Sequence, residues 1–181
     1  MQITGAGVAA MAEEAGPGLE QIFVTHKDLI FRAAYRITGN ASDAEDVLQT
    51  VFLRLARQEK LPEIANLPGY LHRSAVNASL DLLRNRKDTH ISSLDDENNP
   101  AEAVAKDNAG QVAEVRDWLR QALTRLNPRW AEMFVLRFVE DYSNREIART
   151  MKTSAAVVAV VLHRTRALLK KDYMAVTRGT R

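Results

Sequence analysis

Apolar residues recur at three- and four-residue steps through most of the chain, which is the period of amphipathic α-helices. The first such run begins near Leu19, and Gly39 and Asn40 follow it as helix-ending residues. A second helix is predicted over residues 43–57, and no segment shows the two-residue alternation of a strand. The pattern therefore predicts an all-α fold. The buried side of the second helix is expected to hold Val47, Leu48, Val51, Phe52 and Leu55.

Acidic residues gather where this second helix starts. Ser42 and Glu45 have the spacing of a capping box, and Asp43, Glu45 and Asp46 would oppose the positive end of the helix dipole. Capping alone explains such acids in most proteins. Binding of a partner is the alternative interpretation.

A third helix is predicted from Pro68, a residue suited to a first turn, to about Arg86. An apolar strip on it contains Leu71, Ala75, Ala78, Leu82 and Leu83. A second stripe mixes an aromatic ring, an amide, an acid and two arginines at three- and four-residue steps. Such side chains can stack on bases and hydrogen-bond to them, although a solvated face is an equally good interpretation. This stripe contains Tyr70, Arg73, Asn77, Asp81 and Arg84.

Residues 143–171 have the pattern of two helices with a very short turn between them. Ser143 and Glu146 form a capping box for the first helix, and Ser154 can cap a longer second one that runs to about Lys171. One face of the longer helix is apolar and the other cationic, as in a helix-turn-helix that lays its second helix in the major groove. A helical hairpin with a solvated basic face is the alternative. The apolar arc is Val158, Val161, Leu162, Leu168 and Leu169, and opposite it lie His163, Arg164, Arg166, Lys170 and Lys171.

The segment between these parts lacks any period. Residues 88–111 are polar and acidic, as in a flexible linker, and helices resume over residues 112–126 and 128–139, the latter started by Asn127 and Pro128. We therefore expect two small helical domains, residues 19–87 and 112–175. The acidic linker 88–111 would join them, with tails at 1–18 and 176–181, of which the first is expected to be disordered.

Charge is segregated along the chain, although its net value is only +2. Residues 88–118 hold 2 basic and 8 acidic side chains, whereas residues 119–181 hold 13 basic and 5 acidic ones. A basic C-terminal block favours binding of a polyanion such as nucleic acid.

Several classes of protein are excluded by what the sequence lacks. There is no cysteine, the four histidines (His26, His72, His90 and His163) are scattered, and no phosphate-cradling motif occurs. We therefore expect no enzyme, no metal and no cofactor. No apolar run approaches the roughly 20 residues that span a bilayer, so a cytoplasmic protein without membrane insertion is expected.

Four motifs, in order and in register over about residues 20–173, resemble the extracytoplasmic-function (ECF, group 4) sigma factors of bacterial RNA polymerase, in the sigma-70 family. They are DAEDVLQTVF (43–52), YLHRSAVNASLDLLR (70–84), LNPRWAEMFVLRF (126–138) and SNREIA (143–148). The resemblance implies a sigma factor that directs polymerase to specific promoters and assists promoter melting, in a stress or envelope response. It implies core RNA polymerase, promoter DNA and an anti-sigma factor as partners.

The resemblance also implies a role for particular residues. Docking on the clamp helices of the largest polymerase subunit falls to Asp43, Glu45, Asp46, Gln49 and Phe52. The polymerase flap is a further implied contact, and the acidic linker would thread toward the RNA exit path. Opening and holding the −10 element falls to Tyr70, Arg73, Asn77, Asp81 and Arg84. Reading the −35 element falls to Lys152, Thr153, Ser154, Ala156, Ala159, Val160, His163, Arg164, Arg166 and Lys170.

Two stretches depart from the family's pattern. The loop at residues 58–68 lacks the aromatic segment often found before the −10 helix, so the sequence does not place a pocket for a flipped base. Residues 157–162 read VVAVVL where relatives commonly carry polar base readers. Two rival hypotheses follow, namely a DNA-binding regulator related only through its C-terminal half, and a sigma-like interaction protein that no longer reads DNA. An exposed patch at Val157 and Val160 would suit the second rival, because such patches often bind partners.

Overall fold

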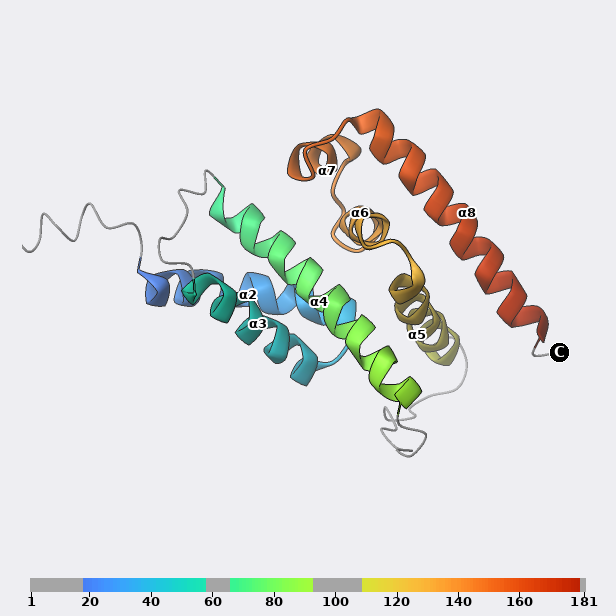
Figure 1. The fold of residues 1–181 in the computed structure, drawn as a ribbon, viewed down its shortest axis with the longest axis horizontal. Coiled ribbons are helices and arrows are strands. Elements are labelled where there is room, and N and C mark those ends of the chain that lie inside the picture. The colour runs from blue at the N-terminus through green and yellow to red at the C-terminus, as the bar shows by residue number, and fades with distance from the viewer. Residues whose placement is uncertain (1–17, 58–65, 93–108, 180–181) are drawn as a thin grey trace, which may run out of the picture.

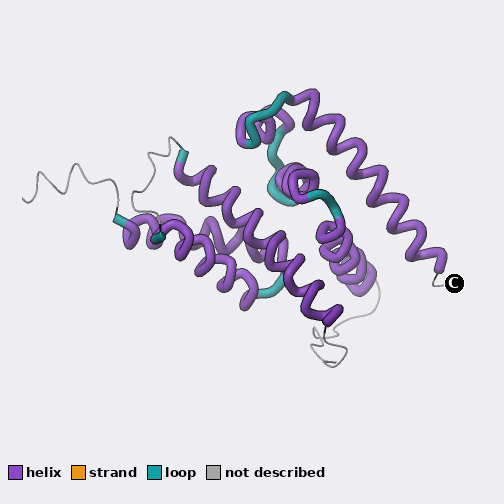
Figure 2. The backbone as a smooth tube through the Cα atoms, viewed as in Figure 1, coloured by secondary structure: helices purple, strands orange, loops and turns teal. Residues whose placement is uncertain are grey.

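The structure is a computed structural model that describes residues 18–57, 66–92 and 109–179. These residues form helices joined by short turns, with no strand among them (Figure 2), so the prediction of an all-α fold is confirmed. The expected N-terminal tail, most of the loop at 58–68 and the centre of the acidic linker lie outside the described residues. The helices are α2 (Leu19–Thr38), α3 (Ala41–Ala56), α4 (Leu67–Ser92), α5 (Ala109–Arg125), α6 (Pro128–Phe138), α7 (Asn144–Thr150) and α8 (Ala155–Gly179).

Helix α4 lies at the centre of the arrangement (Figure 1). Helices α2 and α3 pack on one side of it, and α5 and α6 pack on the other. Helix α8 packs on α6 and α7 and runs along the outer edge of the molecule. Helix α4 thus packs against both groups of helices.

The first hydrophobic core lies between α2, α3 and α4. The stripe predicted on α3 is confirmed, because four of its five residues are buried and Leu48 is partly buried against them. Burial of a large aliphatic side chain contributes roughly 1.5–3 kcal/mol, so this core accounts for the association of the three helices. Its members include Ile22, Ile30, Ala33, Ala34, Val47, Val51, Phe52, Leu55, Leu71, Ala75 and Ala78.

The second core lies between α5, α6, α7 and α8, and it also includes residues of α2 and α4. Ile37 of α2 and Val76 and Leu80 of α4 are buried in it. Helix α4 is therefore apolar on two sides, because positions 76 and 80 are four residues apart and lie away from Leu71 and Ala75. The two helical units that the sequence predicts are both present, and they share a buried interface along α4.

Most helix ends follow the sequence. Gly39 ends α2 with a φ of 73°, a left-handed conformation that favours glycine, and Asn127 and Pro128 start α6 as predicted. The predicted Ser42–Glu45 capping box is wrong, because α3 begins at Ala41, two residues before the predicted start. Asn40 caps it instead, accepting a hydrogen bond from the backbone N–H of Asp43 at 3.3 Å.

Two helices run further than the sequence analysis placed them. Helix α4 continues past Arg86 to Ser92, and α8 continues past Lys171 to Gly179, because neither extension contains a helix-breaking residue before its end. The extension of α8 is also supported by packing, since the ring of Tyr173 meets that of Trp118 in α5 edge to face at 4.8 Å.

Candidate nucleic-acid and polymerase interfaces

The pair α7 and α8 has the geometry predicted for a helix-turn-helix. The hydroxyl of Ser143 accepts from the N–H of Glu146, and the Glu146 carboxylate accepts from the N–H of Ser143 at 2.8 Å, so the capping box is confirmed. The hydrogen bond from the Ser143 hydroxyl lowers the pKa of Glu146 below its ordinary value. Lys152, with a φ of 50°, reverses the chain, and Ser154 caps α8 by accepting from the N–H of Val157 at 3.2 Å.

The buried side of this pair fixes the angle at which α8 leaves α7. Ile147 and Met151 of the first helix pack with Val158 and Leu162 of the second, as their spacing predicts. Leu168 was placed in the same apolar arc, but half of its surface is exposed. Thr165 is fully buried in its place, because positions 158, 162, 165 and 169 follow the three- and four-residue steps of one face.

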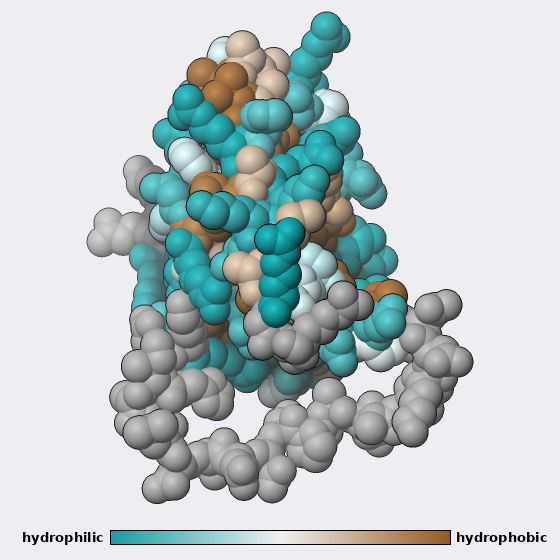
Figure 3. Space-filling model, turned by 90° about the vertical axis from the view of Figure 1, so that its right-hand side faces the viewer, coloured by the Kyte–Doolittle hydropathy of each residue, from teal (hydrophilic) through white to brown (hydrophobic). Residues whose placement is uncertain are grey.

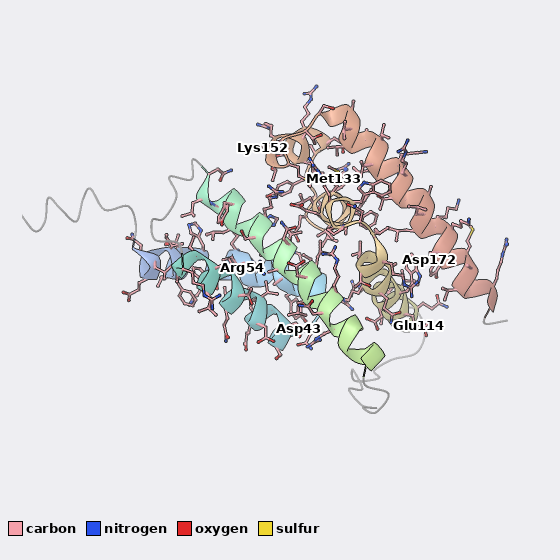
Figure 4. All side chains as sticks on the ribbon, in the orientation of Figure 1. Asp43, Arg54, Glu114, Met133, Lys152 and Asp172 are labelled. Carbon is pink, nitrogen blue, oxygen red and sulfur yellow. The ribbon has the colours of Figure 1, made fainter. Side chains whose placement is uncertain are left out.

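The outer face of α8 is open. Figure 3 looks onto this side of the molecule, where apolar surface gathers at the top, the end at which α8 begins in Figure 1. Val160 is 51% exposed at this end, and Lys152, labelled in Figure 4, stands at the turn beside it. Arg166 lies over the ring of Phe138 at 5.8 Å, so part of its charge is used in a cation–π contact. The other exposed residues of the proposed −35 set are Ala156, Ala159, His163, Arg164 and Lys170, whereas Thr153 is partly buried and the Ser154 hydroxyl serves as the cap.

The polar stripe of α4 is not a free face. Arg73 donates through Nε to Oε1 of Glu132 in α6 at 2.5 Å, and through Nη1 to the carbonyl of Thr150 in α7 at 3.2 Å. Asn77 donates through Nδ2 to the same Glu132 oxygen at 3.3 Å. Glu132 itself is buried, so charge-assisted hydrogen bonds satisfy its carboxylate within the protein. Two of the five residues matched to −10 contacts are thus held by the C-terminal half.

The other three residues of the stripe differ in exposure, since Tyr70 and Asp81 are exposed and Arg84 is only partly so. Arg84 donates to Asp81 at 3.1 Å on the same helix, and Tyr70 lies at the N-terminal end of α4. A cleft lies between α4 on one side and α6 with the turn of the helix-turn-helix on the other. It is lined by Arg73, Asn77, Asp81, Arg84, Pro128, Arg129, Glu132, Met151 and Lys152. The structure therefore brings residues matched to the −10 and −35 sites to the two walls of one cleft.

A buried polar cluster that the sequence analysis did not find lies next to this cleft. His72 of α4 donates through Nε2 to the carboxylate of Glu140 at 2.7 Å. The hydroxyl of Tyr142 donates to Nδ1 of His72 at 3.2 Å. Both contacts suit a neutral imidazole. Arg36 donates to the same Glu140 oxygen at 3.3 Å. The available signal was spacing, since His72, Val76 and Leu80 follow one another at four-residue steps on one face of α4.

The cluster also changes the acidity of a tyrosine. Burial raises the pKa of the Tyr142 hydroxyl, and the nearby charge of Glu140 adds to that increase. The hydroxyl therefore stays protonated and remains a donor to the ring of His72. The rings of the two residues are stacked with their centroids 5.3 Å apart.

The acidic start of α3 divides into buried and exposed positions. Asp43 is only 1% exposed and pairs with Arg86 of α4, whose Nη1 lies 2.6 Å from its Oδ2. Burial raises the pKa of Asp43, and the charge of Arg86 offsets this only in part. Phe52 is 8% exposed and meets the ring of Phe23 edge to face at 4.8 Å. Both side chains are thus engaged within the fold, and the docking face proposed below rests on their exposed neighbours on α3.

An exposed face of α3 remains, and it is larger than the sequence analysis suggested. Glu45, Asp46 and Gln49 are exposed, and Leu53, four residues beyond Gln49, is 56% exposed on the same face. The signal for Leu53 was present, because it falls outside the buried stripe. An acidic face with one exposed leucine suits a protein partner that carries basic and apolar groups.

Metal binding and membrane insertion are two other functions on which the described residues give information. No group of three or more histidine, aspartate and glutamate side chains lies where it could hold a metal ion. None of the described helices combines the length and the apolar character that crossing a bilayer requires.

Comparisons with known proteins agree with this geometry. A helix-turn-helix with a basic outer helix is typical of DNA-binding proteins. The model of Sigma-70 region 2 matches residues 22–89, and that of Sigma-70, region 4 matches residues 116–169. The chain belongs to the sigma-70 family, among the ECF RNA polymerase sigma factors.

The similar proteins include two curated relatives. The chain is 31% identical to the ECF RNA polymerase sigma factor SigE of Mycolicibacterium smegmatis over 90% of its own length, and it spans 64% of the length of that relative. It is 30% identical to the RNA polymerase sigma-E factor of Streptomyces avermitilis, covering 84% of this chain and 83% of the relative. Among solved structures, the sigma factor RpoE from Bartonella quintana, crystallised with the anti-sigma factor NepR, matches with a TM-score of 0.47 and 19% identity, covering 84% of this chain and 94% of the other.

Proposed function

We propose that this protein directs bacterial RNA polymerase to specific promoters and assists the melting of promoter DNA. The observation that carries the proposal is the presence of both sigma regions in one chain, each with an exposed surface of suitable chemistry. The protein acts where RNA polymerase acts, in the cytoplasm, and catalyses no reaction of its own. The names of the relatives point to the same function.

Docking on polymerase falls to the exposed face of α3. Glu45 and Asp46 offer negative charge, Gln49 offers an amide, and Leu53 offers apolar area beside them. Charge complementarity of this kind sets the association rate and the orientation of two proteins. The clamp helices of the largest polymerase subunit are the proposed partner, as the resemblance implies, and the flap is the proposed contact of the C-terminal half.

Promoter opening falls to α4. Tyr70 supplies a ring for stacking, Arg73 and Arg84 supply cations for the backbone, and Asn77 supplies an amide for a base edge. Asp81 holds Arg84 by the ion pair at 3.1 Å and is suited to orient it. Strand capture rests on this helix, since no aromatic residue occurs in the preceding loop at 58–68.

Recognition of the −35 element falls to α8, and it differs in kind from that of α4. Ala156, Ala159 and Val160 have neither donors nor acceptors, but they can pack against thymine methyl groups and allow close approach of the helix. Affinity then comes mainly from contacts with phosphates. The proposed phosphate contacts are Lys152, Arg164, Arg166, Lys170 and Lys171.

The boundaries and regulation of the protein follow the same family pattern. We assign −10 binding to residues 19–87 and −35 binding to residues 112–175, with the acidic linker 88–111 directed toward the RNA exit path. An anti-sigma factor and a stress or envelope signal are proposed on the family resemblance. An anti-sigma factor is the partner named for the RpoE structure.

A second candidate function is favoured by one observation. Val157 and Val160 are each about half exposed at the start of α8, where relatives commonly carry polar base readers. Exposed apolar residues that lie close together often mark a protein interface. In that case the protein would bind a regulator through α8 and would read no −35 sequence.

Reconstitution tests the proposed function. The purified chain is combined with core polymerase, and run-off transcripts are measured on promoters recovered by mapping bound DNA across the genome. Asp46→Arg reverses charge at a partner rim, for which we expect a loss of about 1–2 kcal/mol in binding to core polymerase. Asp28→Arg, an equal change at an exposed position of α2, is the control. Unchanged binding of Asp46→Arg would refute the docking face, and specific transcripts would refute the second candidate.

A further inference from the structure

A cavity of about 650 Å³, here called the α5–α8 cavity, lies between α5, α6 and α8. Helix α8 runs beside the other two helices there (Figure 1). Trp118 meets Tyr173 edge to face and Arg125 pairs with Asp172 at 3.4 Å, so both contacts hold α8 to α5. Cavities of this size are typical of small-molecule sites. The lining residues are Val115, Trp118, Leu119, Phe134, His163, Arg166, Ala167, Leu169, Lys170 and Tyr173.

Most of the lining is apolar. Phe134 and Leu169 are buried in the second core, and Trp118 and Leu119 pack partly buried against it. Ala167 contributes only a methyl group from α8, which leaves space between this helix and α5. A ligand with an apolar chain or ring would remove part of this lining from water, which favours binding.

One side of the cavity is cationic. His163, Arg166 and Lys170 follow one another at three- and four-residue steps, so they share one side of α8. Arg166 lies over the ring of Phe138 at 5.8 Å, whereas His163 and Lys170 are not paired with any other described residue. None of the lining residues that the structure describes is acidic. The charge of this side therefore favours an anionic ligand.

A buried donor without an acceptor belongs to the same lining. The indole N–H of Trp118 is buried and makes no hydrogen bond with the described residues. Such a group costs stability, because it has lost its bond to water and gained no other. The ring of Tyr173, which packs against the indole, is partly exposed and can rotate away. A ligand oxygen that then reached the indole would accept the unused hydrogen bond.

We propose that the α5–α8 cavity binds an amphiphilic carboxylate, that is, an acid with an apolar chain or ring. The apolar part lies on Trp118, Leu119 and Phe134. The carboxylate pairs with Arg166 and Lys170. The polymerase flap is the competing occupant, but an apolar side chain of a protein would leave the indole donor without an acceptor.

The proposed site has a consequence for DNA binding. Arg166 and Lys170 are also proposed contacts with phosphates, so a bound carboxylate and a promoter would compete for the same cations. This consequence rests on the proposed function of α8, whereas binding of the acid does not. A test of the site therefore has to measure the two events separately.

The first measurement is a titration of the full-length chain with sodium dodecanoate, kept below the concentration at which it forms micelles. Proton–nitrogen NMR follows the indole N–H of Trp118, which the variant Trp118→Phe distinguishes from that of Trp130. Dodecanol has the same chain without the charge, and butyrate has the charge with almost no chain. These two compounds are the ligand controls.

Two pairs of variants test the residues of the site. Lys170→Gln removes a charge from the cavity, and Lys171→Gln removes one from the next position, which does not line it. Ala167→Phe fills the space, and Leu168→Phe adds a ring at an exposed neighbour outside the cavity. Circular dichroism confirms that each variant is folded.

Under the proposal, dodecanoate shifts the indole signal of Trp118 and binds at least about tenfold more tightly than either control compound. Ala167→Phe abolishes this binding, and Lys170→Gln weakens it about threefold, as the loss of one exposed ion pair does. Lys171→Gln and Leu168→Phe resemble the parent. Equal binding of dodecanol, or binding that neither Ala167→Phe nor Lys170→Gln changes, overturns the proposal. So does a parent that binds no acid while Ala167→Phe weakens capture of core polymerase, since the cavity then belongs to the flap.

The second measurement is the affinity for a fluorescein-labelled promoter duplex, by anisotropy, with and without dodecanoate. We expect the acid to weaken DNA binding by the parent and by Lys171→Gln, and to leave that of Ala167→Phe unchanged. Unchanged affinity of the parent with the acid bound overturns the competition but leaves the site standing. A parent that binds no duplex even without the acid refutes the function of α8, and the titration then decides on the cavity alone.

Discussion

Helices α4 and α8 both carry residues that the family resemblance matches to DNA contacts. The two helices differ in the chemistry of these residues and in their exposure. Helix α4 carries arginines, an amide and a ring that can read or hold bases, yet two of these side chains are bound to Glu132 of α6. Helix α8 is open along its outer face, yet its first exposed turns carry alanine and valine. Helix α4 thus has side chains that can bind bases, but two of them are engaged within the protein. Helix α8 is exposed, but its first turns lack side chains that can hydrogen-bond to bases.

We infer from this difference that the two halves of the chain have separate roles in DNA binding. An open, basic and largely apolar face binds duplex DNA through phosphates and gains little discrimination from hydrogen bonds. On α4, the hydrogen bonds of Arg73 and Asn77 with Glu132 compete with any contact to DNA. We infer that initial DNA binding rests on α8 and that promoter opening, the more specific event, rests on α4.

The largest effect should come from the buried face of α4. Leu80→Ala removes a side chain from the shared core, and we expect it to lower the free energy of unfolding by about 2–4 kcal/mol. Leu168→Ala on exposed α8 is the control and should cost less than about 1 kcal/mol. Urea unfolding followed by circular dichroism measures both. Equal, small losses would show that α4 does not bury this face in solution.

The next effect concerns the C-terminal part of α4, where Arg86 pairs with buried Asp43. Arg86→Met leaves that carboxylate without its partner, so we expect the free energy of unfolding to fall at pH 7. The expected loss is only about 1–3 kcal/mol, because the Arg86 side chain is half exposed. Burial already raises the pKa of Asp43, so the folded state favours the protonated acid. The loss should therefore shrink as the pH falls toward about 4, the ordinary value for aspartate. Asp43→Asn in the same background should restore stability, and a failure to do so would contradict the assignment.

A smaller effect tests the role of α4 in opening. Arg84→Ala should slow promoter melting about tenfold, which corresponds to the loss of about 1.4 kcal/mol from a contact with the unpaired strand. Arg84 is a better choice than Asn77, because Asn77 also donates to Glu132 and its removal would disturb the contact between α4 and α6.

Permanganate footprinting on duplex and pre-melted promoters measures the defect of Arg84→Ala. A defect confined to the duplex template supports a role in opening. An equal defect on both templates would instead assign Arg84 to strand binding alone. Arg125→Ala, an exposed arginine paired only with Asp172 among the described contacts, is the control.

The chemistry of α8 predicts a still smaller and less specific effect. Arg164→Ala should weaken binding to all −35 sequences alike and reduce the salt slope by about 1, as the loss of one phosphate contact does. Val160→Lys should tighten non-specific binding and blur any preference at a thymine.

Titrations over a set of −35 variants at two salt concentrations measure both changes. If Val160→Lys leaves the base preference unchanged and abolishes capture by an anti-sigma factor, the valine patch is a protein interface. In that event α4 would bind DNA, whereas α8 would bind a protein.

The smallest effect should come from the cap that positions α8 through α7. Glu146→Gln weakens the hydrogen bonds with Ser143, so the melting temperature should fall slightly at neutral pH. The pKa of Glu146 is lowered by those bonds, and its contribution is therefore complete above the ordinary glutamate value and is lost as the pH falls through the lower one. Thermal scans from pH 7 to pH 3 measure the difference. Glu20→Gln, at the start of α2 where no side chain caps the helix, should show no such pH dependence.

Local patterns along the sequence determined the helices and their buried faces. The three- and four-residue steps placed the buried stripe of α3, and Ser143, Glu146 and Ser154 placed the starts of α7 and α8, because capping and amphipathic periodicity depend on neighbours within one or two turns. The order and spacing of the four motifs indicated the family. The predicted C-terminal ends of α4 and α8 were wrong, because no helix-breaking residue occurs at the predicted positions.

Only the tertiary structure decided which side chains are available. Asp43 and Glu45 lie two residues apart at one helix start, yet one is buried against Arg86 and the other is exposed, because α4 covers one side of α3 only. Val76 and Leu80 gave α4 a second apolar face, but no local rule showed that α6 would cover it. The pairing of Arg73 with Glu132, 59 residues apart, is likewise a product of that packing. Sequence periodicity reports which face of a helix is apolar, whereas the identity of the element packed on it depends on contacts distant along the chain.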